Sequence, residues 1–346
     1  MPPAIGIQKF ERQVYAMQPL TILSFCSLLT FVHLILSTTV AQEQDVLQSN
    51  KSEELVSSIG LKLVMIPAGE FQMGSGELVH LIAPFDEPKH AVTISQSFYM
   101  SVCEVTKGQF AEFVNDVGYK TDAEKNRGGM GLGKSVMTRA NDTVFPVERN
   151  KSYTWSKTGF FQMANYPVVN VSWNDAIAFC EWLSKRENCN YQLPTEAQWE
   201  YACRAGTQTR YFNSDKDADL HKIGNLLDEK AQDVFHFHEA SRENDGYAAT
   251  APVGRFPANS FGLRDMHGNV NEWCKDIYGK YPKEAVSDPV GPTEGSERVV
   301  RGGSWYSTTN GKMARSAARQ HRDPSHCDFN TGFRVIMIPQ LSATDK

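Results

Sequence analysis

Hydrophobic residues recur at helical spacing in segments that follow residues suited to cap a helix N-terminus. Thr106, Ser172 and Thr195 supply the capping hydroxyls, and Asp175 and Gln198 stand three residues after the last two. Such pairs satisfy backbone N–H groups that have no partner within the helix. We therefore predict that three helices begin after these hydroxyls. The residues expected to form their core-facing sides are Ala176, Phe179, Leu183, Trp199, Ala202 and Cys203.

An apolar run near the N-terminus has the features of an export signal. Residues 20–36 are mainly apolar, basic residues precede them, and the small residues Thr39, Val40 and Ala41 follow. This order is typical of a cleaved signal peptide. We predict a signal peptide at 1–41 and a secreted or periplasmic protein with no stable membrane span after processing. The alternative is that residues 20–36 remain as a membrane anchor.

The rest of the chain is interpreted as a polar spacer at 42–60 and one large domain at 61–340. No linker rich in Pro, Gly or Ser and no block of charge divides that domain. Hydrophobic residues make up 41% of the chain, which is enough for an ordinary core. The formal net charge of −5 comes without a basic run, so nucleic acid is not an expected partner.

Six cysteines remain if the signal peptide is removed: Cys103, Cys180, Cys189, Cys203, Cys274 and Cys327. In an exported protein an even number permits disulfide bonds, and a Cys180–Cys189 bridge would be local. The other interpretation is that these residues are small buried thiols. The sequence leaves both open.

A series of short motifs along the chain is similar to those of formylglycine-generating enzymes, the sulfatase-modifying-factor family. The motifs occupy residues 63–75, 98–110, 166–176, 193–206, 261–274, 301–305 and 331–335. They follow the family's order over roughly residues 60–338. The resemblance implies an α+β fold, irregular and C-type-lectin-like, with few short strands and helices and long loops braced by calcium. The first motif resembles the family's opening strand and hairpin.

Acidic and amide residues in two loops point to calcium. Residues 265–272 carry two carboxylates on either side of a Gly-Asn turn, and Ca²⁺ takes roughly six to eight oxygens from carboxylates and backbone carbonyls. The resemblance implies two such sites. Their ligands would be Asn225, Leu226, Asp245 and Tyr247 in the first loop, and Asp265, Gly268, Val270 and Glu272 in the second. The other interpretation is that these residues only cap turns.

The resemblance implies a family oxidase that is a copper enzyme with two thiolate ligands. These two ligands have no counterpart in this sequence. By the resemblance, the first cysteine position falls on Ser307 and the second near Gly311 or Lys312. Cu(I) is a soft ion that prefers sulfur, and a serine hydroxyl is a hard, weak ligand. Copper is therefore not an expected cofactor, whereas calcium is. The residues retained to shape a polar groove are Ser304, Trp305 and Arg315.

Two classes of function remain open. The first is an exported, calcium-stabilised domain without the copper chemistry, a pseudoenzyme that serves as a binding or accessory module for an exported protein, a peptide or a glycan. The second is an enzyme, either a formylglycine-generating oxidase acting on a sulfatase cysteine or an oxidoreductase with another substrate. The missing thiols favour the first class.

Overall fold

The described part of the chain begins at residue 54 in this computed structural model. It comprises residues 54–76, 88–133, 136–137, 143–144, 147–236, 243–307 and 312–339. The predicted signal peptide and most of the predicted spacer lie outside these ranges. Within them, no helix combines the length and the hydrophobicity needed to cross a membrane.

The largest sheet joins the beginning and the end of the described chain. Val64 and Ile336 lie on two different strands and both pair with Met100 on the strand between them. All three side chains are buried, so this sheet covers part of the core. Its strands, in spatial order, are β1 (Leu55–Val56), β2 (Lys62–Ile66), β5 (Phe98–Ser101), β16 (Ile336–Ile338) and β10 (Asn190–Gln192).

A second sheet carries much of the candidate site. Its strands, in spatial order, are β14 (Gln320–Arg322), β13 (Arg298–Arg301), β11 (Asn271–Ile277) and β15 (Thr331–Gly332). Strand β11 runs antiparallel to β13 and parallel to β15. The other strands in the described ranges form a three-stranded sheet and two pairs: β12 (Val286–Ser287), β4 (His90–Ile94) and β3 (Gly69–Met73); β6 (Gly129–Leu132) and β9 (Val147–Asn150); β7 (Val136–Met137) and β8 (Thr143–Val144).

Two boundaries differ from those expected from the sequence. The expected opening hairpin is divided between two sheets, because β2 pairs with β1 and β5 whereas β3 pairs with β4. Pro67 lies between β2 and β3, and a proline has no N–H with which to continue a ladder. The fold also begins before residue 61. Leu55 and Ile59, from the predicted spacer, pack against the core.

The three predicted helices are confirmed with their predicted caps. Thr106, Ser172 and Thr195 are the N-caps, and each hydroxyl accepts a hydrogen bond from the backbone N–H three residues on. The helices are α2 (Lys107–Val117), α4 (Trp173–Glu187) and α5 (Glu196–Arg204). The six residues predicted to face the core are all 0% exposed. The elements that sequence analysis missed include α3 (Asp122–Lys125), α6 (Glu229–Phe235) and the 3₁₀ helix η2 (Asp217–Lys222).

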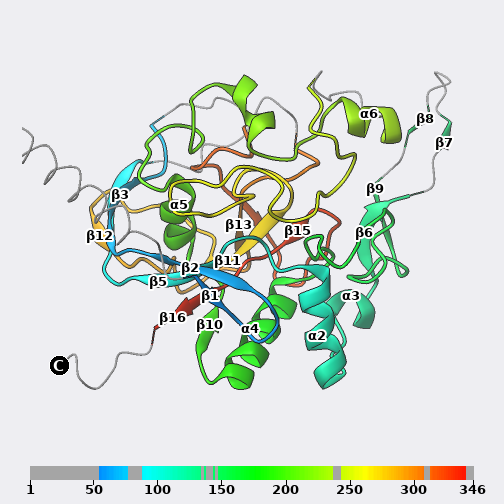
Figure 1. Cartoon of the computed structure of the whole chain (residues 1–346), viewed down its shortest axis with the longest axis horizontal. Helices are drawn as coiled ribbons and strands as arrows, with labels where there is room; N and C mark the ends of the chain where they lie inside the picture. The colour runs from blue at the N-terminus through cyan, green and yellow to red at the C-terminus, as the bar shows by residue number, and fades with distance from the viewer. Residues whose placement is uncertain are drawn as a thin grey trace, which may run out of the picture. The chain divides into compact units, whose positions relative to one another are not determined.

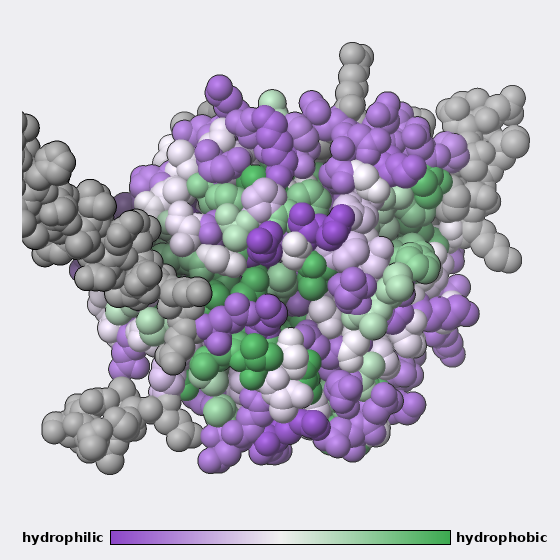
Figure 2. Space-filling view, viewed as in Figure 1, coloured by the Kyte–Doolittle hydropathy of each residue, from purple (hydrophilic) through white to green (hydrophobic). Residues whose placement is uncertain are grey.

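The helices and the long loops lie in different parts of the fold. Helices α2, α3 and α4 gather on one side of the strands, and the loops between α5 and β11 lie on the other (Figure 1). Phe179 of α4 packs against Phe110 of α2 and against Phe333, with ring centroids 6.0 and 5.3 Å away. On the face shown in Figure 2, apolar residues gather near the middle and polar residues around the border. An aromatic core therefore supports a loop region that carries Asp228, Asp245 and Asp265, three of the acidic residues discussed below.

Candidate functional site

The second predicted calcium loop holds a buried carboxylate with an unsatisfied oxygen. Asp265 is 2% exposed and has a left-handed backbone, with φ of 60°. Its Oδ2 accepts a hydrogen bond from the backbone N–H of Gly254 at 2.5 Å. Its Oδ1 accepts no hydrogen bond from another described residue when both carboxyl groups are ionised, but the carboxylate can accept one from Glu104 when Glu104 holds a proton. Burial raises the pKa of Asp265, because an ionised carboxylate is costly in a buried site unless a cation neutralises it.

Glu104, which sequence analysis did not select, supplies a second unsatisfied oxygen. Its Oε1 accepts a hydrogen bond from Nδ2 of Asn269 at 2.9 Å, and its Oε2 has no partner within the described ranges. Burial, and then the charges of Asp265 and Glu272, raise the pKa of Glu104 well above its usual range. The two unsatisfied oxygens therefore belong to carboxylates that interact strongly with each other.

Glu272 was a predicted ligand, but both of its oxygens are already engaged. Arg334 donates to Oε2 at 2.6 Å and to Oε1 at 2.7 Å, and Nε1 of Trp199 donates to Oε2 at 2.7 Å. Calcium ligation by this side chain stays a prediction, and in the structure a buried arginine neutralises the carboxylate. We refer to the set of three carboxylates and one guanidinium as the acidic cluster: Glu104, Asp265, Glu272 and Arg334.

The residues predicted for the first calcium loop also converge. Asp245 accepts hydrogen bonds from the backbone N–H groups of Leu226 and Tyr247, each at 2.9 Å. Asp228, which was not predicted, accepts a hydrogen bond from the backbone N–H of Asp245 at 2.6 Å. Burial and the charge of Asp228 raise the pKa of Asp245 to about 7. Oδ1 of Asn225 is buried and has no hydrogen-bond partner in the described chain.

The two loops lie against each other. The carbonyl of Asn225 accepts a hydrogen bond from the backbone N–H of Asn269 at 2.8 Å, and Nδ2 of Asn225 donates to Oδ1 of Asn269 at 3.1 Å. Gly268 lies at this contact, where a Cβ would come within 2.3 Å of the Asn225 carbonyl oxygen, so only glycine fits. Val270, the other predicted carbonyl ligand, is fully buried. The structure thus brings the residues of both predicted sites into one region.

The unsatisfied oxygens are of the chemical type that binds calcium. Oδ1 of Asp265, Oε2 of Glu104 and Oδ1 of Asn225 are hard oxygen donors, and Ca²⁺ binds carboxylate, amide and carbonyl oxygens. Across the described ranges, no three His, Cys, Asp or Glu side chains are grouped so that they could hold a metal ion. Backbone carbonyls and water would therefore have to complete the coordination of any calcium held here.

The predicted groove residues lie beneath the surface. Ser304 and Trp305 are 0% exposed and Arg315 is 2% exposed. Trp305 packs between the rings of Phe160 and Phe329, with centroids 5.6 and 5.5 Å away. Ser304 and Trp305 are therefore interior residues, and the prediction that they shape a polar groove would require a surface formed by their neighbours. Arg315 does contribute to the wall of a small pocket of about 190 Å³.

Ser307, at which the resemblance predicts the family's first copper-binding cysteine position, takes part in a turn. Its Oγ accepts a hydrogen bond from the backbone N–H of Ser304 at 3.0 Å, and its carbonyl accepts one from the backbone N–H of Leu227 at 3.0 Å. For the second position, Gly311 lies outside the described residues and Lys312 offers an amine. These donors do not fit Cu(I), which binds thiolates.

The six cysteines named above are all free in the structure, and the Cys180–Cys189 bridge is not formed. Burial raises the pKa of Cys203 to about 12 and that of Cys274 well above its usual range. Burial likewise raises the pKa of Cys327. These side chains are therefore neutral thiols near pH 7, whereas metal binding requires the thiolate.

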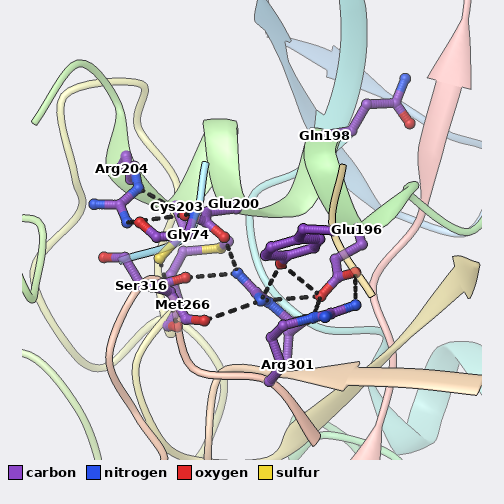
Figure 3. Close-up of polar contacts among 12 residues, drawn as sticks. Gly74, Glu196, Gln198, Glu200, Cys203, Arg204, Met266, Arg301 and Ser316 are labelled. Atoms are coloured by element: carbon purple, nitrogen blue, oxygen red, sulfur yellow. Dashed lines mark hydrogen bonds and ion pairs between the residues drawn. The ribbon is translucent and has the colours of Figure 1, made fainter. Parts of the chain in front are cut away.

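A second group of buried charges surrounds helix α5 and contrasts with the acidic cluster. Arg301 lies between two glutamates of the helix and donates to Glu196 at 3.1 Å and to Glu200 at 2.5 Å (Figure 3). Arg204 pairs with Glu200 at 2.8 Å, and Arg319 pairs with Glu196 at 2.6 Å. All five side chains are at most about 5% exposed. We refer to these two carboxylates and three guanidiniums as the arginine-paired network.

The fold and these loops define a class of protein. Residues 51–338 match the sulfatase-modifying factor enzyme 1-like domain, and the chain belongs to this family. Both the predicted family and the predicted α+β, C-type-lectin-like fold are confirmed.

Individual relatives include formylglycine-generating enzymes and one protein described as inactive. The chain is 36% identical over 296 residues to the formylglycine-generating enzyme of Mus musculus, covering 79% of this chain and 74% of the relative. It is 30% identical over 306 residues to the inactive C-alpha-formylglycine-generating enzyme 2 of Bos taurus, covering 83% and 92%. The structure of PvdO from Pseudomonas aeruginosa matches with a TM-score of 0.62 and 26% identity, covering 83% of this chain and 98% of that one.

Proposed function

We propose that this protein is an exported member of the family that lacks the copper oxidase chemistry and serves as a binding or accessory module. The observation that carries the proposal is Ser307, a serine whose hydroxyl is engaged in a turn at the first thiolate position. The likeness to an inactive relative is consistent with it. Cys274 and Cys327 are buried, and neither belongs to a group of three His, Cys, Asp or Glu side chains among the described residues that could hold a metal ion, which argues against rescue by these thiols.

The oxygen donors of the two predicted loops support calcium as the cofactor. It would be held in the first loop by Asn225 and Asp245 with the carbonyls of Leu226 and Tyr247, and Asp228 adjoins this set. In the second loop it would be held by the residues whose oxygens are open or in the backbone, namely Asp265, Glu104, Gly268 and Val270. When bound, calcium would supply positive charge that holds the two loops together.

An apolar surface next to the covered Trp305 supports a binding role. Phe160 packs on Trp305, and its neighbours Phe161 and Met163 are 73% and 57% exposed. Large exposed apolar side chains that lie close together are often part of a contact surface. An exported protein or peptide that offers apolar side chains would suit this surface better than a glycan.

The test of the proposed function is a direct assay for aldehyde formation. Purified protein is incubated with Cu(I), oxygen, a thiol reductant and a Cys-x-Pro-x-Arg peptide, and the peptide is then analysed by mass spectrometry. We expect no conversion of cysteine to formylglycine, whereas a formylglycine-generating enzyme treated in parallel converts the peptide. Conversion that is abolished by Cys274→Ser or Cys327→Ser would overturn the proposal in favour of the alternative, an oxidase with a rearranged site.

A further inference from the structure

A cavity of about 450 Å³ lies beside the N-terminus of helix α5. It contains neither Ser307 nor any predicted calcium ligand, so it is separate from the sites described above. This volume lies within the range of small-molecule sites, roughly 300–1,000 Å³. Most of the lining is apolar, and it includes Met73, Ala197, Ile277, Val286, Pro289 and Pro292.

A buried carboxyl group forms part of the wall of this cavity. Asp276 lines it and is 4% exposed. Its Oδ2 accepts a hydrogen bond from the backbone N–H of Glu196 at 2.8 Å. No other residue of the described chain donates a hydrogen bond to Asp276 or forms an ion pair with it within 4.0 Å. Apart from the backbone N–H of Asp276 itself, the carboxyl group has no further donor, so it can still accept a hydrogen bond from a ligand.

The other charged and titratable groups of the cavity already have partners or lie near its rim. Arg319 donates to both carboxylate oxygens of Glu196, at 2.6 and 2.7 Å. Its guanidinium carbon also lies 3.9 Å from the ring centroid of Tyr281, so the two groups stack. The ring of His90 packs against Tyr281, with centroids 5.0 Å apart. Lys280 is exposed. The one arginine in the lining is thus committed to Glu196, and Asp276 has no cation of its own.

We propose that this cavity binds a small ligand with an apolar body and a protonated amine, and that Asp276 receives the amine. An ammonium group would supply both the missing hydrogen-bond donor and the missing positive charge. The apolar walls and the rings of Tyr281 and His90 would hold the body of the ligand. A ligand carboxylate or phosphate would meet Asp276 and Glu196, so anions are disfavoured. The proposal does not depend on whether the protein is an oxidase.

The test compares probes that share a ring and differ in the head group. The probes are 2-phenylethylamine, 2-phenylethanol and 3-phenylpropionate, and binding to the full chain is measured by calorimetry. We expect the amine to bind at least tenfold more tightly than the other two. N-acetyl-lysine amide distinguishes a free amine ligand from a lysine side chain, because tighter binding of this probe would assign the site to peptide lysine.

Variants of the cavity complete the test. Asp276→Asn keeps an oxygen for the Glu196 N–H, and we expect it to lose at least tenfold in affinity for the amine, whereas Asp233→Asn on the exposed face of α6 changes nothing. Val290 is 61% exposed at the mouth of the cavity, so Val290→Trp can obstruct it with little effect on folding and should weaken all three ring probes.

The dependence on pH gives an independent readout. Burial and the charge of Glu196 raise the pKa of Asp276 to about 7, although Arg319 opposes the shift. The amine stays protonated, so its affinity should rise several-fold between about pH 6 and pH 8 as Asp276 ionises. Equal affinities for the three ring probes, or amine binding that Asp276→Asn leaves intact, would overturn the proposal.

Discussion

The arginine-paired network and the acidic cluster are both buried, yet their charges balance differently. The network places Glu196 and Glu200 among three arginines, and neither glutamate has an unsatisfied oxygen. The acidic cluster places three carboxylates around Arg334 alone, and two of its oxygens are unsatisfied. Trp199 lies between them, since it donates to Glu272 and stacks with Arg301 at 5.2 Å.

This difference separates a structural role from a role in binding a cation. A buried charge is tolerated when an opposite charge and hydrogen bonds replace its water. The two carboxylates of the arginine-paired network meet that condition through its guanidiniums, although Nε of Arg301 is buried without a hydrogen-bond partner in the described chain. The acidic cluster meets it only if Glu104 or Asp265 takes up a proton, or if a cation is added. The predictions below test this contrast, from the largest expected effect to the smallest.

The largest effect is expected from Arg301→Met. Removing the guanidinium leaves Glu196 and Glu200 each with one arginine in a site closed to water, and breaking a buried pair costs about 3–5 kcal/mol. Urea denaturation followed by circular dichroism measures the free energy of unfolding. Lys62→Met is the matched control, because Lys62 pairs with Glu54 at 2.9 Å on the surface, and we expect no resolvable change there. An equal loss in the two variants would contradict the structural role of the network.

The second prediction concerns calcium. At a concentration of about 100 times the dissociation constant, calcium should stabilise the protein by roughly 2.7 kcal/mol per site. Asp265→Ala should remove the contribution of the second loop, and Asp245→Ala that of the first. Thermal unfolding in EDTA and in millimolar calcium measures the difference. Superimposable melting curves of the unmodified protein under the two conditions would count against both sites.

Much of the fold could be predicted from the sequence, because its signals are local. Ser172 with Asp175, and Thr195 with Gln198, are capping pairs within one helical turn, and both form as predicted. Strand pairing could not be predicted equally well. Whether the segment after Pro67 pairs with β2 or with β4 depends on contacts with distant segments, which no local pattern encodes.

The same limit applies to the candidate site. Asp265 and Asp245 stand in motifs and were found, whereas Glu104 contacts Asn269 across 165 positions of sequence and carries no spacing signal. Arg334 likewise pairs with Glu272 from a distant part of the sequence, so this ion pair is visible only in the three-dimensional structure. Asp228 was also not predicted, although it lies only two residues after the predicted ligand Leu226. It is the N-cap of α6.

The third prediction concerns pH in the absence of calcium. The folded pKa of Asp245, about 7, lies above the ordinary aspartate value of 3.8, so the folded state holds a proton that the unfolded state has released. Stability from this group is therefore present at low pH and lost as pH rises through about 7. Between about pH 6 and pH 8 the loss should be close to 1.4 kcal/mol. Calcium replaces the proton, so its effect on the melting temperature should be larger at the higher pH.

A control separates Asp245 from Asp276, whose pKa is also raised to about 7 by burial and by Glu196. Both groups lower stability as pH rises, but only Asp245 lies in a predicted calcium loop. Asp245→Asn should therefore reduce the pH dependence measured in EDTA and the additional benefit of calcium at pH 8. A benefit of calcium that is the same at both pH values would contradict this assignment.

The last prediction replaces a glutamate of each group by glutamine, and it gives the sharpest contrast in sign together with the smallest single effect, that of Glu104→Gln. Glu200→Gln should destabilise the protein, because Arg204 and Arg301 both lose a charged partner. Glu104→Gln should raise stability in EDTA by up to about 1 kcal/mol, because glutamine is neutral without the proton that burial and the charges of Asp265 and Glu272 force Glu104 to take up. Its remaining amide oxygen can still accept the hydrogen bond from Asn269. The same variant should lose part of the stabilisation by calcium, because it replaces a carboxylate oxygen with a neutral donor. Destabilisation of Glu104→Gln in EDTA as large as that of Glu200→Gln would show that the acidic cluster is balanced without a cation.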